Sequence, residues 1–104
     1  MARVGFKMQL LKGNEEEYKK RHDAIWPELQ ELLKKSGISN YVIYLDAPTG
    51  VLFASMDVSD NHTTAENRHH PVMKKWWDFM GDIMVTNPDR SPVALPLKEV
   101  FFLP

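Results

Sequence analysis

The stretch Ser39–Val58 reads SNYVIYLDAPTGVLFASMDV, in which two runs rich in β-branched and aromatic residues flank the turn residues Asp46–Gly50. Runs of this composition on either side of a short Pro- and Gly-containing connection are typical of two antiparallel strands. The stretch therefore predicts a β-hairpin, with strands over residues 39–45 and 51–58.

The first strand of this hairpin carries bulky apolar side chains on both faces. Alternation along the strand places Tyr41, Ile43 and Leu45 on one face and Val42 and Tyr44 on the other. Helices of the same chain can cover one face, but a chain of 104 residues has nothing left to cover the second. The pattern predicts that the second face packs against another copy of the chain, as a homodimer, or encloses a ligand cavity.

The sequence before the hairpin supplies a strand and a helix. Residues 3–11 alternate between apolar and polar types and predict a strand. Residues 15–35 repeat apolar residues at spacings of three and four, as one face of a helix does, and Gly37 supplies the stop. Pro27 lies inside this helical pattern, so we expect a kink or a break near residues 23–26.

The sequence after the hairpin repeats this plan. Residues 61–84 return to helical spacing, in two segments divided at Pro71. Residues 85–96 contain three prolines and predict an irregular loop. Residues 98–103 predict a last strand. The order β-α-β-β-α-β is that of a ferredoxin-like α+β fold, in which helices cover one face of a sheet. We expect residues 1–104 to form a single domain of this class.

The first predicted helix also has signatures at its start and on its exposed face. Asn14 followed by Glu17 is a capping-box pattern, in which each side chain bonds the other residue's backbone N–H. Opposite charges four residues apart, such as Glu17 and Arg21, predict a solvated face stabilised by ion pairs rather than a functional site.

Composition excludes several classes of function. Thirteen Lys and Arg against fourteen Asp and Glu leave a net charge of −1, with no basic surplus for nucleic acid or an anionic membrane. The chain has no cysteine, and no apolar run reaches the roughly 20 residues of a membrane span. We therefore expect a cytoplasmic protein that binds neither nucleic acid nor membrane and uses no disulfide or thiolate.

His22 is the residue that most strongly indicates a site. It lies on the apolar stripe of the first helix, one turn after Tyr18 and one turn before Trp26, where a leucine would pack without polar cost. A histidine on such a face is commonly a hydrogen-bonded core residue, and the alternative is an acid–base or ligand-binding residue. Tyr18 adds a neutral hydroxyl beside it, so the two predict a polar wall in an aromatic pocket.

Trp76 and Trp77 are adjacent and point about 100° apart on a helix, so both line one cavity only if it wraps around that helix. Two core tryptophans are the simpler interpretation. However, flat aromatic faces with a few hydroxyl partners also suit a sugar ring. Tyr41 and Tyr44 lie on opposite strand faces, and alternation alone does not decide which of them shares such a pocket.

Other chemistries are disfavoured by spacing. His62, Glu66, His69 and His70 lie about one turn apart, but position 65 is alanine, so the zinc-protease pattern is absent and we expect no metal. The five glycines are dispersed and form no phosphate-binding loop, and no serine has the context of a nucleophile.

Along its whole length the chain resembles the L-rhamnose mutarotase family. The motifs that carry the resemblance are Tyr18, Arg21-His22, Ile25-Trp26-Pro27-Glu28-Leu29, Asn40-Tyr41, Ile43-Tyr44-Leu45-Asp46, Trp76-Trp77, Asn87-Pro88-Asp89, Ser91-Pro92-Val93 and Glu99-Val100-Phe101-Phe102-Leu103-Pro104. The resemblance implies a dimeric ferredoxin-like α/β-barrel and an isomerase that interconverts the α and β anomers of L-rhamnose without a cofactor. It also implies that His22 is the proton donor. Four further residues are implied to bind the sugar: Tyr18, Tyr41, Trp76 and Trp77.

Mutarotation requires two proton transfers, because the ring opens when the anomeric hydroxyl loses a proton and the ring oxygen gains one. A histidine, with an ordinary pKa of about 6.5, is suited to one of them. The second group stays open among Tyr18, Tyr41, a carboxylate and an ordered water. The alternative functions are a non-catalytic dimeric α/β-barrel that binds a small ligand, and a haem- or aromatic-substrate monooxygenase on the same barrel.

Overall fold

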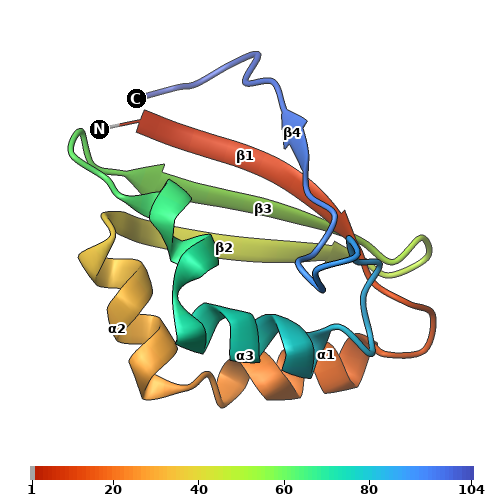
Figure 1. Cartoon of the computed structure of the whole chain (residues 1–104). Helices are drawn as coiled ribbons and strands as arrows, with labels where there is room; N and C mark the ends of the chain where they lie inside the picture. Colours follow the sequence, from red (N-terminus) through yellow and green to blue (C-terminus); the bar gives the residue numbers. More distant parts are fainter. Residues whose placement is uncertain (1) are drawn as a thin grey trace.

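The computed structural model describes residues 2–104 and contains one four-stranded antiparallel sheet with its helices on one side (Figure 1). Its elements in chain order are β1 (Ala2–Gln9), α1 (Glu15–Asp23), α2 (Pro27–Lys35), β2 (Ile38–Asp46), β3 (Val51–Val58), the 3-10 helix η1 (Thr64–His69), α3 (Pro71–Met80) and β4 (Leu95–Leu97). The strands lie in the order β2-β3-β1-β4. The predicted hairpin and the predicted order β-α-β-β-α-β are confirmed.

Prolines divide both helical connections, as the sequence predicted. Pro27 begins α2 and Pro71 begins α3, each at a first-turn position where the missing N–H leaves no helical hydrogen bond unmade. Gly37 follows α2 with a φ of 103°, a left-handed conformation that glycine adopts without strain. Within residues 2–104, no helix is both long enough and apolar enough to span a bilayer.

Two local expectations are wrong. Asn14 makes no side-chain cap; its amide instead donates to the carbonyl oxygens of Leu11 and Lys12, which fold the preceding turn. The last strand is Leu95–Leu97 rather than residues 98–103, and Pro96 lies within it opposite Phe6. Proline is tolerated there because β4 is an edge strand, whose outer side needs no backbone donor.

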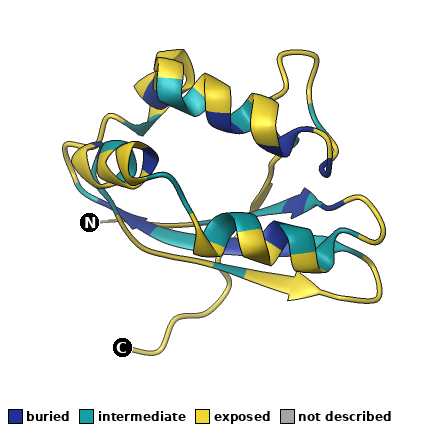
Figure 2. Ribbon diagram, turned by 90° about the horizontal axis from the view of Figure 1, so that it is seen from below, coloured by how far each residue is buried: buried dark blue, intermediate teal, exposed yellow. Residues whose placement is uncertain are grey.

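The core lies between the sheet and the helices, and Figure 2 shows buried segments of strand and helix facing this layer. Its largest fully buried side chains are Leu29 of α2 and Leu52 of β3. The opposite face of the sheet is open, and Tyr44 on it retains 65% of its exposure. The helices therefore cover a single face, and within residues 2–104 apolar residues such as Tyr44 and Phe53 stay exposed on the other.

Candidate active site

A cavity of about 1130 Å³ lies between the helical layer and the sheet. All five residues that the sequence singled out line it: Tyr18 and His22 from α1, Tyr41 from β2, and Trp76 and Trp77 from α3. Residues from three separate elements therefore meet at one space. Tyr44 does not line this cavity and faces away from it.

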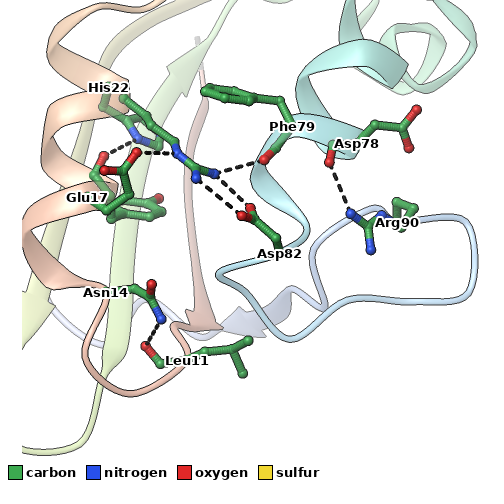
Figure 3. Close-up of polar contacts among 10 residues, drawn as sticks. Leu11, Asn14, Glu17, His22, Asp78, Phe79, Asp82 and Arg90 are labelled. Atoms are coloured by element: carbon green, nitrogen blue, oxygen red, sulfur yellow. Dashed lines mark hydrogen bonds and ion pairs between the residues drawn. The ribbon is translucent and has the colours of Figure 1, made fainter.

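His22 has one ring nitrogen engaged. Its Nδ1 lies 3.0 Å from the backbone carbonyl oxygen of Tyr18, one turn earlier in α1 (Figure 3). A carbonyl only accepts hydrogen bonds, so Nδ1 carries the proton. Burial lowers the pKa of His22 below its ordinary value, and this outweighs the opposing effects of the Tyr18 carbonyl and of the Asp23 charge. At neutral pH the ring is therefore neutral, with its basic lone pair on Nε2.

Aromatic rings hold the His22 imidazole from two sides. The Tyr18 ring stacks on it at a centroid distance of 4.2 Å, and the Trp76 indole meets it edge-to-face at 5.4 Å. Trp76 in turn packs edge-to-face on Trp26 at 5.1 Å. These contacts restrict the orientation of the imidazole, because rotating it breaks packing on both faces.

The two tyrosines stay neutral at physiological pH. Burial raises the pKa of Tyr41 to about 12. Burial, and secondarily the neighbouring Tyr41 hydroxyl, raises the pKa of Tyr18 well above its usual range. Because Tyr41 affects the pKa of Tyr18, the two hydroxyls lie in the same region of the cavity, although one comes from β2 and the other from α1. Both hydroxyls are thus available as hydrogen-bond donors and acceptors.

The predicted ion pair between Glu17 and Arg21 is present, but the prediction that Arg21 lies on a solvated face is wrong. Its side chain is only 12% exposed; it donates from Nε to Glu17 at 2.7 Å, and from Nη1 to Asp82 and to the Phe79 carbonyl oxygen, both at 2.8 Å (Figure 3). These bonds join α1 to the end of α3, from which Trp76 and Trp77 project. The spacing in sequence between Arg21 and Asp82 offers no signal for this contact.

A second arginine, which the sequence interpretation did not consider, supports the same end of α3. Arg90 lines the cavity, and its Nη2 donates to the carbonyl oxygen of Asp78 at 3.0 Å (Figure 3). A Cβ at Gly81 would lie only 2.7 Å from the Arg90 guanidinium carbon. Glycine at position 81 therefore leaves the room that this guanidinium occupies.

The histidines outside the cavity do not gather into a metal site. Among residues 2–104, no three His, Asp or Glu side chains are grouped closely enough to hold a metal ion. His62 lies 3.0 Å from the Thr64 hydroxyl, and His70 accepts from the Val72 N–H at the start of α3. These two residues therefore have local structural partners.

An aromatic cavity that contains a neutral histidine is typical of an α+β protein that binds a small molecule. The family model described as L-rhamnose mutarotase matches residues 3–103. Relatives named L-rhamnose mutarotase from Formosa agariphila and Sinorhizobium fredii are 50% and 55% identical, each over 99% of both chains. A crystal structure titled as the L-rhamnose mutarotase from Formosa agariphila covers 100% of both chains with a TM-score of 0.94 and 49% identity. The chain belongs to the L-rhamnose mutarotase family.

Proposed function

We propose that this cavity interconverts the α and β anomers of L-rhamnose, with His22 as a proton-transfer residue. The family to which the chain belongs makes it a carbohydrate isomerase. The observation that carries the residue assignment is the hydrogen bond from Nδ1 to the Tyr18 carbonyl, because it leaves Nε2 as the basic atom of a partly buried, neutral imidazole.

Ring opening begins at the anomeric hydroxyl. Nε2 of neutral His22 takes the hydroxyl proton, the O–H electron pair forms the carbonyl, and the bond from C1 to the ring oxygen breaks as that oxygen gains a proton from a second group. Rotation about the bond between C1 and C2 presents the other carbonyl face. Ring closure reverses the transfers, so His22 then donates its proton to the carbonyl oxygen and becomes neutral again. This is the step in which it acts as proton donor.

Of the groups considered for the second transfer, Tyr18 and Tyr41 are the two tyrosines that line the cavity with His22. Their raised pKa values keep both protonated, so either hydroxyl donates a hydrogen bond toward the ring oxygen or passes a proton from water. Trp77, which is partly exposed in the cavity, offers an indole face to the sugar ring.

The direct test is acceleration of anomer exchange. L-rhamnose at its anomeric equilibrium is examined by NMR saturation transfer, and the protein is expected to increase the rate of magnetisation exchange between the α and β H1 signals. Binding of L-rhamnose with no increase in that rate would instead support the non-catalytic binding module.

The lowered pKa of His22 predicts the pH dependence. The neutral form that begins ring opening is lost only when His22 is protonated, so kcat/KM is expected to stay level near neutral pH and to decline only below pH 6.5. Folding stability follows the same sign: the unfolded chain, in which His22 has its ordinary pKa of 6.5, binds this proton first, so stability falls as the pH drops below that value. Exchange rates corrected for the uncatalysed reaction measure the profile, and a decline centred above pH 6.5 would contradict the assignment.

We further propose that two copies of the chain pair through the open face of the sheet to form the dimeric α/β-barrel. Paired residues of neighbouring strands point to the same face, so Tyr44, Phe53 and Leu95 form one apolar row with Lys7 across the sheet. The C-terminal segment adds further apolar surface, with Val100 86% exposed. Contiguous apolar surface of this kind marks an interface.

This dimer predicts the effect of a charge in the row. Sedimentation equilibrium is expected to give the mass of two chains for the wild type and of one chain for Tyr44→Asp, because a carboxylate would replace the most exposed apolar side chain of the row and lose its water in the interface. Lys75→Asp, a charge reversal on the exposed side of α3, is the control and is expected to remain dimeric. A monomeric wild type would overturn the dimer without affecting the assignment of His22.

A further inference from the structure

The pairing of β2 with β3 is interrupted by one extra residue on β2. Ser39 pairs with Asp57 and Val42 pairs with Ser55, so two residues of β2, Asn40 and Tyr41, stand opposite the single residue Met56. An extra residue on one strand of an antiparallel pair is a β-bulge, which bends the strand and redirects its side chains.

The bulge changes which side chains face the cavity. Ile38 and Ile43 both line the cavity although they are five residues apart, and an odd separation in a regular strand points two side chains to opposite faces. A strand continued from Ile38 without the extra residue would direct Tyr41 to the opposite face of the sheet. The bulge is therefore what allows β2 to contribute Tyr41, Ile43 and Leu45 to the same cavity as Ile38.

Asn40 holds the bulge in two ways. Its φ of 49° is in the left-handed region, which asparagine adopts more readily than most residues. Its Nδ2 also donates to Oδ2 of Asp57 on β3 at 3.0 Å, while Nε of Arg3 on β1 donates to Oδ1 of the same carboxylate at 3.3 Å. Asp57 is buried, and these bonds, with the one from Asn40 contributing most, hold its pKa below the usual range. A carboxylate shared by three strands thus anchors the residue that precedes Tyr41.

Tyr41 itself has one ring contact across the sheet. Its ring meets that of Phe6 edge-to-face at a centroid distance of 6.2 Å. Tyr41 also remains 39% exposed, so packing alone restricts it less than the buried Tyr18. The backbone before it therefore contributes a large share of its orientation.

We infer that Asn40 and Asp57 are positioning residues that set the orientation of the Tyr41 hydroxyl in the sugar site. The inference rests on the proposed sugar-binding role of Tyr41. Asn40 lines the cavity, but its amide is engaged by Asp57, so both residues are expected to act through the backbone conformation at the bulge rather than by touching the substrate. Their loss is expected to weaken binding of L-rhamnose while His22, which lies on a different element, continues to transfer protons.

The test compares alanine and glycine at position 40. Asn40→Ala is expected to raise KM for L-rhamnose about tenfold, because alanine lacks the amide and disfavours the left-handed conformation. Asn40→Gly lacks the amide too but adopts that conformation freely, so its KM is expected to stay within about threefold of wild type. In both variants kcat is expected to change less than about twofold. Equal KM values for Asn40→Ala and wild type, or equal defects in the two variants, would overturn the inference.

A double-mutant cycle with Tyr41→Ala separates positioning from general loosening of the sheet. If Asn40 acts through Tyr41, Asn40→Ala changes KM less than about twofold once the Tyr41 side chain is absent. A tenfold effect that persists in the Tyr41→Ala background would overturn the inference alone. A wild-type KM for Tyr41→Ala by itself would instead overturn the sugar-binding role of Tyr41, and the inference with it.

Two further variants keep the test decisive. Asp57→Asn retains an oxygen acceptor but loses the charge, and it replaces Asn40→Ala in the same cycle if Asn40→Ala does not fold. It is expected to raise KM about threefold when Tyr41 is present and to leave KM unchanged in the Tyr41→Ala background. Asp46→Asn perturbs the opposite end of β2, where the carboxylate accepts from the Thr49 hydroxyl. This control is expected to lower thermal stability without raising KM, and a KM rise equal to that of Asp57→Asn would overturn the inference.

Discussion

His22→Ala is expected to lower the enzyme-catalysed exchange rate of the L-rhamnose anomers by about 10²- to 10⁴-fold, the usual contribution of a positioned acid–base group. Among the described residues that line the cavity, His22 has the one ring with a basic nitrogen, and its Nδ1 bond to the Tyr18 carbonyl orients it. Alanine removes the base without placing another in reach of the anomeric hydroxyl. The loss is expected in kcat, since His22 acts in the chemical step.

NMR saturation transfer measures this loss, with wild type and variant at matched concentrations and with thermal unfolding to show that the variant is folded. His69→Ala is the matched control, because His69 is exposed and does not line the cavity, and it is expected to exchange the anomers at the wild-type rate. Exchange retained in folded His22→Ala would leave the isomerase activity in place and move the proton transfer to another residue.

Trp76→Ala is expected to cost about 3–5 kcal/mol of unfolding free energy, as large-to-small substitutions of buried aromatic residues do. Trp76 is only 7% exposed and contacts Trp26, Phe79 and His22. Its removal leaves a void between α3 and the break that separates α1 from α2. Urea unfolding measures the change, and the substitution is also expected to lower kcat because His22 loses its edge-to-face partner.

Trp77→Ala provides the comparison for this prediction. Trp77 lies next in the chain and lines the same cavity, but it is less buried than Trp76. Its loss is expected to raise KM for L-rhamnose with a much smaller change in unfolding free energy, because it removes a binding surface rather than core packing. Equal stability losses for the two variants would contradict this difference in how far the two tryptophans contribute to core packing.

Local patterns were enough to predict the helical breaks and to single out His22 and Tyr18 as candidate site residues. A proline inside a helical repeat interrupts it through its own ring, which is why α2 and α3 begin at Pro27 and Pro71. The position of His22 on an apolar stripe likewise required no knowledge of the neighbouring elements. The alternation of β2 after the bulge separated Tyr41 from Tyr44, but the family resemblance was needed to choose between them.

The remaining features depend on residues that are distant in sequence. The place of the last strand depends on which residues of the C-terminal segment pair with the free edge of β1. The structure therefore has this strand at Leu95–Leu97, whereas the sequence pattern predicted residues 98–103. The Arg21–Asp82 contact joins residues 61 positions apart, and Asn40 depends on a carboxylate 17 positions away.

The sequence by itself therefore determined the order of elements, the helical breaks and the chemical types available to the site, because these follow from spacing along the chain. The tertiary structure decided the tautomer of His22 and the bulge that turns Tyr41 into the cavity. It also decided the contacts that Arg21 and Arg90 make with the end of α3. Each of these depends on burial or on a hydrogen-bond partner whose position is set only when the sheet and helices pack together.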